Sequence, residues 1–145
     1  MRIEKFPFII IFGILIVGFV YYQSIYISLG GFSITKNNIK NVIVSTQDKT
    51  YMVTNQQVVF DLAERVSKMQ RSQKIDFMRF PPGSTSEPYR KLLIQTKDHV
   101  TYGGSIWNLS AGNALDSAGY YWIVQDDLVT ALDKAINDSQ TTQLS

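Results

Sequence analysis

The longest uninterrupted run of hydrophobic residues stands near the start of the chain. "FPFIIIFGILIVGFVYYQSIYI" covers Phe6–Ile27 and contains no charged residue. A helix rises about 1.5 Å per residue, so this run is long enough to cross a hydrocarbon core of about 30 Å. The pattern predicts a transmembrane helix, with Tyr21, Tyr22 and Tyr26 at one membrane–water interface.

The charges that flank this run predict its orientation. Arg2 and Lys5 precede it, and the next basic residue is Lys36. The positive-inside rule then makes residues 1–27 a cytoplasmic stub and anchor in the cell membrane, and places the rest outside the cytoplasm. The alternative is a cleaved secretory signal, whose best cleavage site, Ser28-Leu29-Gly30, is crowded by bulky neighbours.

Composition divides the remaining chain into three parts. Residues 28–38, "SLGGFSITKNN", combine paired glycines with small polar residues, which predicts a linker. We expect an extracytoplasmic domain over residues 39–137. The polar residues 138–145 predict a flexible tail.

The first part of the domain alternates between apolar and polar positions and then changes to a helical period. "NVIVS" and "TYMVT" predict a β-hairpin with its turn at residues 46–49. Thr54, followed three residues later by Gln57, predicts the start of a helix with a capping box. The apolar positions that follow at helical spacing are Val58, Val59, Leu62, Val66 and Met69.

Short strands are expected in the middle of the domain. Ile75–Phe80, Tyr89–Lys97 and Tyr120–Gln125 have strand composition, and a further strand around Gly103-Gly104 carries an expected bulge or bend. "PPGSTSEP" at 81–88 and "SAGNALDSAG" at 110–119 are predicted loops.

The last element has the clearest helical pattern. Asp126 or Asp127 is expected to cap it, and its apolar positions are Leu128, Ala131, Leu132, Ala135 and Ile136. The predicted order is therefore about β-β-α-β-β-β-β-α. Two helices would pack on a mostly antiparallel sheet, which is an α+β fold.

Charge and cysteine content exclude several classes of function. The chain has 145 residues, a formal net charge of +2 and no cysteine. From Lys36 onward, 12 Lys/Arg residues face 11 Asp/Glu residues. We therefore expect no nucleic-acid partner, because such binding needs a basic stripe. Disulfides, cysteine nucleophiles and thiolate zinc sites are excluded.

No motif for catalysis, metal binding or cofactor binding is present. His99, the single histidine, stands beside Asp98 at a predicted turn. It is the only histidine that could activate Ser105 as a nucleophile, and no orienting acid is evident. An envelope hydrolase that uses Glu87, His99 or Asp116 is the weakest alternative. We predict no enzyme activity, no cofactor and no metal.

Aromatic residues gather in the second half of the chain. Exposed aromatic rings suit glycan stacking or a protein interface, whereas most such rings pack in a core. The candidate partner-binding residues are Tyr102, Trp107, Tyr120, Tyr121 and Trp122.

Three stretches resemble small membrane-anchored extracytoplasmic proteins of Gram-positive bacteria: "MRIEKFPFIIIFGILIVGFVYY", "NVIVSTQDKTYMVTNQQVVFDLAERV" and "GYYWIVQDDLVTALDKAI". The resemblance implies a role at the cell surface and carries no catalytic residue. We expect a binding module anchored in membrane lipid through residues 6–27. Its partner would be another envelope protein or cell-wall material. The alternative is an accessory subunit of a membrane complex that acts through its span.

Overall fold

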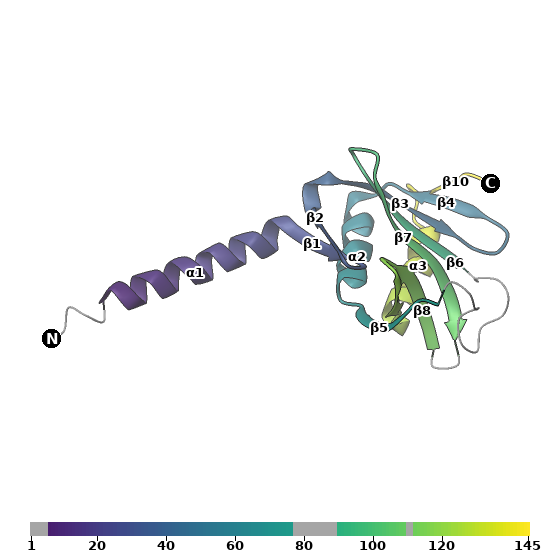
Figure 1. Ribbon diagram of the computed structural model, residues 1–145. Helices are drawn as coiled ribbons and strands as arrows, with labels where there is room; N and C mark the ends of the chain where they lie inside the picture. The colour runs from purple at the N-terminus through teal and green to yellow at the C-terminus, as the bar shows by residue number, and fades with distance from the viewer. Residues whose placement is uncertain (1–5, 77–89, 110–111) are drawn as a thin grey trace.

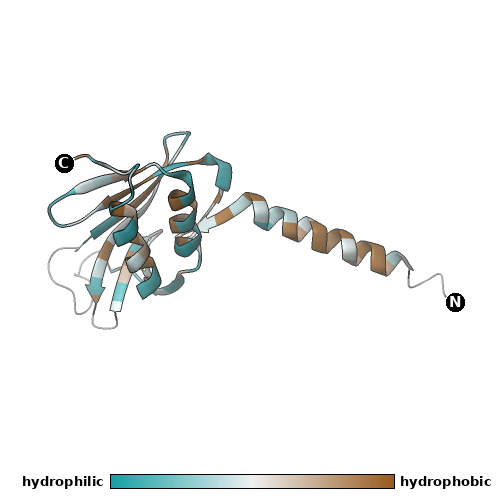
Figure 2. Ribbon diagram, turned by 180° about the vertical axis from the view of Figure 1, so that it is seen from behind, coloured by the Kyte–Doolittle hydropathy of each residue, from teal (hydrophilic) through white to brown (hydrophobic). Residues whose placement is uncertain are grey.

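The computed structural model describes residues 6–76, 90–109 and 112–145. A single apolar helix, α1 (Phe6–Ile25), projects as a rod from an α+β domain (Figure 1). The predicted fold class is therefore confirmed. Figure 2 shows that apolar residues predominate along this rod, while the helices of the domain carry both apolar and polar residues.

A large antiparallel sheet forms the centre of the domain. Its strand order is β10-β4-β3-β6-β7-β8-β9-β5. The strands are β3 (Ile39–Ser45), β4 (Thr50–Val53), β5 (Gln70–Lys74), β6 (Arg90–Thr96), β7 (Thr101–Leu109), β8 (Gly112–Ser117), β9 (Tyr120–Ile123) and β10 (Thr142–Gln143). Two helices, α2 (Gln56–Ser67) and α3 (Asp126–Ile136), lie on one side of this sheet, as Figure 2 shows from behind.

The two helices bury the apolar stripes that their spacing predicts. Val59, Leu62, Ala63 and Val66 of α2 are buried, as are Leu128, Ala131, Leu132 and Ala135 of α3. They pack on strand residues such as Val42, Leu92 and Ile106, which form one continuous core with them. Burying each such side chain contributes about 1.5–3 kcal/mol, so this core supplies most of the driving force for folding.

The caps of both helices differ from prediction. Asn55, not Thr54, caps α2, and its side chain accepts a hydrogen bond from the backbone N–H of Gln57 at 3.2 Å. Gln125 holds the cap position of α3, so Asp126 and Asp127 lie in its first turn, where they face the positive end of the helix dipole. An acidic first turn and an acidic cap have the same composition, which explains the error of one residue.

The predicted linker is wrong. Residues 26–35 form a second, two-stranded sheet, β1 (Tyr26–Leu29) and β2 (Phe32–Thr35), and a 3-10 turn, η1 (Lys36–Asn38), joins it to β3. Ile27, Leu29 and Ile34 of this hairpin belong to the buried core. The folded domain thus begins at Tyr26, directly after α1.

Gly30 and Gly31 form the two-residue turn of this hairpin, and both have positive φ, at 56° and 94°. Such a turn matches the twist of the paired strands. Gly30 is buried, and its carbonyl accepts a hydrogen bond from the Ser117 hydroxyl at 3.0 Å. This bond fastens the hairpin to β8 of the large sheet.

We expect Gly30→Ala to destabilise the domain by about 2–5 kcal/mol, because a left-handed residue with a side chain is strained and the bond to Ser117 must break. An added Cβ would lie 2.5 Å from the Ser117 Oγ. Gly119→Ala is the matched control: its φ is 79°, but no atom lies within 4 Å of the added Cβ. Urea denaturation of both variants measures the difference, and equal losses would contradict the proposed fastening.

Three other predicted features of the domain differ. The predicted loop at 110–119 contains β8, in which Ala114 and Leu115 are buried. A strand that was not predicted, β5, forms at Gln70–Lys74 ahead of the predicted strand 75–80; residues 77–80 and the predicted loop at 81–88 lie outside the described residues. The end of the predicted tail pairs with β4 as β10, and the Leu144 N–H donates to the Thr50 carbonyl at 2.7 Å.

The glycine pair in β7 forms no bulge with β6. Gly103 has φ 106°, yet the pairing of β7 with β6 runs through Gly103 and Gly104 with no shift. A Cβ on Gly103 would lie 2.1 Å from the Leu92 carbonyl oxygen, so no side chain fits there. The close approach of β6 therefore requires glycine at this position.

Candidate functional site

The strand pairing divides the predicted aromatic surface between the two faces of the sheet. Directly paired residues of antiparallel strands share a face. Trp107 pairs with Ala114, and Tyr121 pairs with Asp116, on the face that points away from the helices. Tyr102, Tyr120 and Trp122 pair with residues of the helix-side face. The five residues predicted as one contact surface therefore do not form one.

The helix-side aromatic residues pack within the domain. The Trp122 indole N–H donates to the Ser117 carbonyl at 2.9 Å, and its ring lies against Gly31. The Tyr102 ring meets the Phe32 ring with centroids 5.4 Å apart. Tyr120 receives the Arg71 guanidinium over its ring at 4.6 Å, which joins edge strand β5 to β9. These rings stabilise the hairpin and the sheet edge.

Trp107 is held in place on the opposite face by Asp116, which is half-buried. The Asp116 carboxylate accepts one hydrogen bond from the Trp107 indole N–H at 2.9 Å and another from the Ser105 backbone N–H at 2.7 Å. A Cβ on Gly104 would overlap Asp116 Oδ1 at 2.1 Å, so glycine makes room for the carboxylate. The ring is thus fixed before any partner binds, which lowers the entropic cost of binding.

We expect Asp116→Asn to destabilise the domain by about 1.5–3 kcal/mol, because an amide nitrogen would face one of two donors that now bind a charged acceptor. Asp48→Asn is the control, since Asp48 is exposed in the β3–β4 turn, at no helix end, and its carboxylate forms no hydrogen bond with a described residue. Its effect should stay within about 0.5 kcal/mol. Thermal denaturation measures both; comparable losses would show that the carboxylate does not hold the ring.

Tyr121 is not a contact residue in this structure. Its side chain is only 4% exposed, although it lies on the same face as Trp107. Burial, with smaller contributions from the negative charges of Asp116 and Asp76, raises the pKa of its hydroxyl. The predicted role of Tyr121 in direct partner contact is therefore wrong as the domain stands.

An apolar row crosses four strands on the face that also carries Trp107. Ile43 pairs directly with Met52 on one side and with Leu93 on the other, and Leu93 pairs with Gly103. Met52, Ile43 and Leu93 are all half-buried, and no helix in the described part of the chain covers them. Figure 1 is seen from this side of the sheet, with α2 and α3 behind. We call the row of Met52, Ile43 and Leu93 the outer-face patch; Trp107 lies on the same face, four residues beyond Gly103 along β7.

The residues considered for catalysis do not assemble. His99 is exposed in the β6–β7 turn with φ 66°. Ser105 is four residues beyond Thr101 along β7, which places it more than about 10 Å from the turn. Asp116 is engaged with Trp107, and Glu87 lies outside the described residues. Within the described ranges, no three His, Asp or Glu side chains come together at a metal-binding distance.

Asp98 is a structural residue of the same turn. Its carboxylate accepts a hydrogen bond from the Asn38 side-chain amide at 2.9 Å and another from the Thr96 hydroxyl. These two bonds, that from Thr96 first, lower the pKa of Asp98. Through Asn38, Asp98 joins η1 to the sheet. The neighbouring His99 is not among its hydrogen-bond partners, so Asp98 and His99 form no catalytic dyad.

The groove between α2 and α3 is lined by both apolar and polar residues, and an ion-pair cluster centred on Arg65 lies in it. Arg65 donates to Asp61 at 3.0 Å, as the sequence spacing indicates, and to Asp127 of α3 at 2.9 Å. Asp127 therefore joins the two helices as well as facing the dipole of its own helix. An exposed ion pair of this kind contributes about 0–1 kcal/mol to stability, so these two pairs have a modest structural role.

Comparison with known proteins adds no assignment to this geometry. No protein-family model, no curated protein and no solved structure matches the chain.

Proposed function

We propose that this chain is a single-pass membrane protein whose domain lies outside the cytoplasm and binds a protein of the cell envelope. The observation that carries the proposal is α1. Its side chains from Phe8 to Tyr22 are exposed on every side of the helix, and none of its apolar 18-residue window is buried in the domain. At about 1.5 Å per residue, its 20 residues match a hydrocarbon core of about 30 Å.

Water is an unfavourable surrounding for such a helix. Burial of an apolar side chain is worth about 1.5–3 kcal/mol, and α1 leaves Phe12, Leu15 and Phe19 at least 61% exposed. A bilayer removes this cost and leaves all backbone groups paired inside the helix. The basic residues Arg2 and Lys5 ahead of α1 favour a cytoplasmic N-terminus.

The hairpin supports retention of the anchor over cleavage of a signal. Cleavage after Gly30, the last residue of the Ser28-Leu29-Gly30 site, would remove β1 and with it Ile27 and Leu29, although both side chains are buried in the core. It would also remove Gly30, whose carbonyl accepts the hydrogen bond from Ser117. A cut there would destabilise the domain, which argues for an intact chain.

The outer-face patch supports a binding role. Antiparallel sheets often expose one face to water, and that face then carries polar side chains. Here Met52, Ile43, Leu93 and Trp107 stand at half-exposed positions of that face instead. A partly exposed apolar row, with a fixed indole on the same face, has the composition of a protein-binding surface.

Photo-crosslinking in intact cells tests this role. A photoreactive residue at Leu93 should give a discrete adduct with one partner. Ile43→Lys should reduce the yield of this adduct at least about fivefold, because burying an unpaired lysine charge in the interface weakens binding. Gln57→Lys on the exposed surface of α2 is the matched control and should leave the yield unchanged. Equal yields in both variants would overturn the assignment of this face.

The same assay separates the domain from the span. Replacing residues 6–25 with an unrelated apolar helix should preserve the adduct at Leu93 if the domain provides the binding surface. Loss of the adduct, with the domain still folded and membrane-bound, would instead favour an accessory subunit that acts through α1.

A further inference from the structure

No linker residue separates α1 from the domain. Helix α1 ends at Ile25, and β1 begins at Tyr26. Ile27 is already 93% buried in the core, and the Tyr22 and Tyr26 rings stack across the junction with centroids 4.7 Å apart. If α1 spans the bilayer, as proposed above, its last turn lies at the membrane surface and the domain is held there with it.

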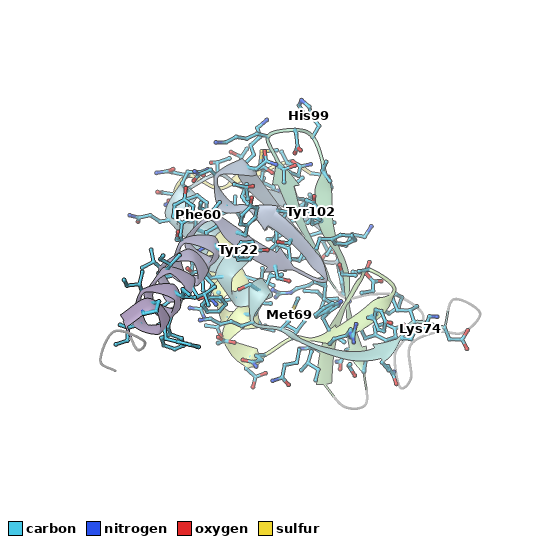
Figure 3. All side chains as sticks on the ribbon, turned by 60° about the vertical axis from the view of Figure 1, so that its left-hand side comes forward. Tyr22, Phe60, Met69, Lys74, His99 and Tyr102 are labelled. Carbon is cyan, nitrogen blue, oxygen red and sulfur yellow. The ribbon has the colours of Figure 1, made fainter. Side chains whose placement is uncertain are left out.

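Two adjoining crevices open where this last turn meets the domain. They have volumes of about 520 and 240 Å³ and share Ile27, Lys36 and Glu64. The larger is also lined by Tyr22, Tyr26 and Lys68, and the smaller by Phe60 of α2. Figure 3 views the molecule from the side on which α1 emerges, and Tyr22 and Phe60 both lie on this side.

The chemistry of these crevices suits the headgroup layer. Lys36 and Lys68 form no ion pair with any residue in the described ranges, although Glu64 lies one helical turn before Lys68. Phe60 and Tyr26 expose 39% and 41% of their surface. Amphipathic and aromatic rings partition into membrane interfaces, and basic side chains there are attracted to lipid phosphates.

We propose that this surface docks the domain against the bilayer, with Lys36 and Lys68 binding the phosphates of anionic phospholipid headgroups. The occupant is the leaflet in which α1 ends, because the crevices adjoin the last turn of the span. With Glu64 counted, the site carries a net charge of +1, which matches one phosphodiester. The inference rests on the proposed membrane span and adds the orientation of the domain to it.

The absence of cysteine allows a direct test on the full chain. Phe60→Cys, labelled with a fluorophore, is reconstituted in vesicles of phosphatidylcholine and phosphatidylglycerol that contain a headgroup spin label as quencher. We expect strong quenching at position 60 and little at Gln143→Cys, because β10 lies at the far end of the domain from α1 (Figure 1).

Neutralising the two lysines should release the domain. Each basic residue at an anionic membrane surface contributes about fivefold to binding, so Lys36→Gln with Lys68→Gln should lower the docked-to-undocked ratio by about 25-fold. Lys49→Gln with Lys134→Gln removes the same charge from exposed positions outside the crevices and should leave the ratio unchanged. Equal quenching in both double variants would overturn the proposal.

Two further measurements identify the cause of any failure. Flotation with the vesicles reports the span alone: a chain that does not float contradicts the membrane anchor, whereas one that floats with position 60 unquenched contradicts only the docking. Inorganic phosphate should have the same effect as sodium chloride at equal ionic strength. Specific release by phosphate would assign the crevice to a soluble phosphate ligand and overturn the lipid assignment.

Discussion

A chain that starts at Lys36 should fold poorly or not at all, whereas a chain that starts at Tyr26 should fold as a stable domain. The shorter chain lacks Ile27, Leu29 and Ile34, which are 7%, 1% and 6% exposed in the core. Their burial is worth about 1.5–3 kcal/mol each, and the sum approaches the net stability of about 5–15 kcal/mol of a whole domain. Urea denaturation of both fragments, followed by circular dichroism, measures the difference.

Point variants of the longer fragment show whether burial is the cause. Leu29→Ala should cost about 2–5 kcal/mol, the usual range for a buried leucine. Phe32→Ala, which removes a ring that is 45% exposed from the same hairpin, is the control and should cost clearly less. Identical denaturation midpoints for the two fragments would show that residues 26–35 are a linker after all.

Charging the middle of α1 should release the protein from the membrane. Each lysine at the centre of a span costs about 2.5–3.5 kcal/mol on the insertion scale, so Ile14→Lys with Leu15→Lys should cost about 5–7 kcal/mol. Both positions are exposed on the helix surface, so no packing within the domain is lost. Alkaline carbonate extraction of membranes measures the partition, with Ile14→Val and Leu15→Ile as the apolar control.

Release of the unmodified chain by carbonate would contradict the span itself. Retention of the lysine variant would indicate that α1 is held by a protein partner and not by lipid. The two lysines also leave the core of the domain unchanged, so their effect on its denaturation midpoint should be negligible. That second readout separates loss of insertion from loss of folding.

The elements that could be predicted from the sequence have long or strongly periodic patterns. α1 is uniformly apolar, and α2 and α3 bury the residues that their spacing predicts. Strands β3, β4, β6 and β9 were recognisable from dense β-branched and aromatic residues. In each case the local pattern and the tertiary packing favour the same structure.

The β1–β2 hairpin was missed because its signal is short and overlaps another. Ile27 belongs to the end of the apolar run, so each strand of the hairpin is left with one core position in the supposed linker: Leu29 in β1 and Ile34 in β2. The Gly30-Gly31 pair is a signature of a two-residue hairpin turn as well as of a flexible linker. The contact with Ser117, which is far away in sequence, favours the hairpin turn over the flexible linker.

The candidate site could be predicted only in part, for a related reason. The alternation of Tyr120, Tyr121 and Trp122 shows that the rings must point to both faces, but the identity of each face depends on pairing with β8. The role of Asp116 was hidden because its segment has loop composition. The crevices beside α1 bring together residues of α1, β1, η1, α2 and β3, and no local pattern reports such proximity.

Cysteine labelling in intact cells tests the central claim, that α1 stays attached and places the domain outside the cytoplasm. With Gln143→Cys as the only thiol, a maleimide that cannot cross membranes should label the full-length chain without permeabilisation. A cysteine inserted after Met1 should be labelled only after lysis. Labelling of position 143 only after lysis, or on a chain shortened by about thirty residues as a secretory signal would be, would contradict the account.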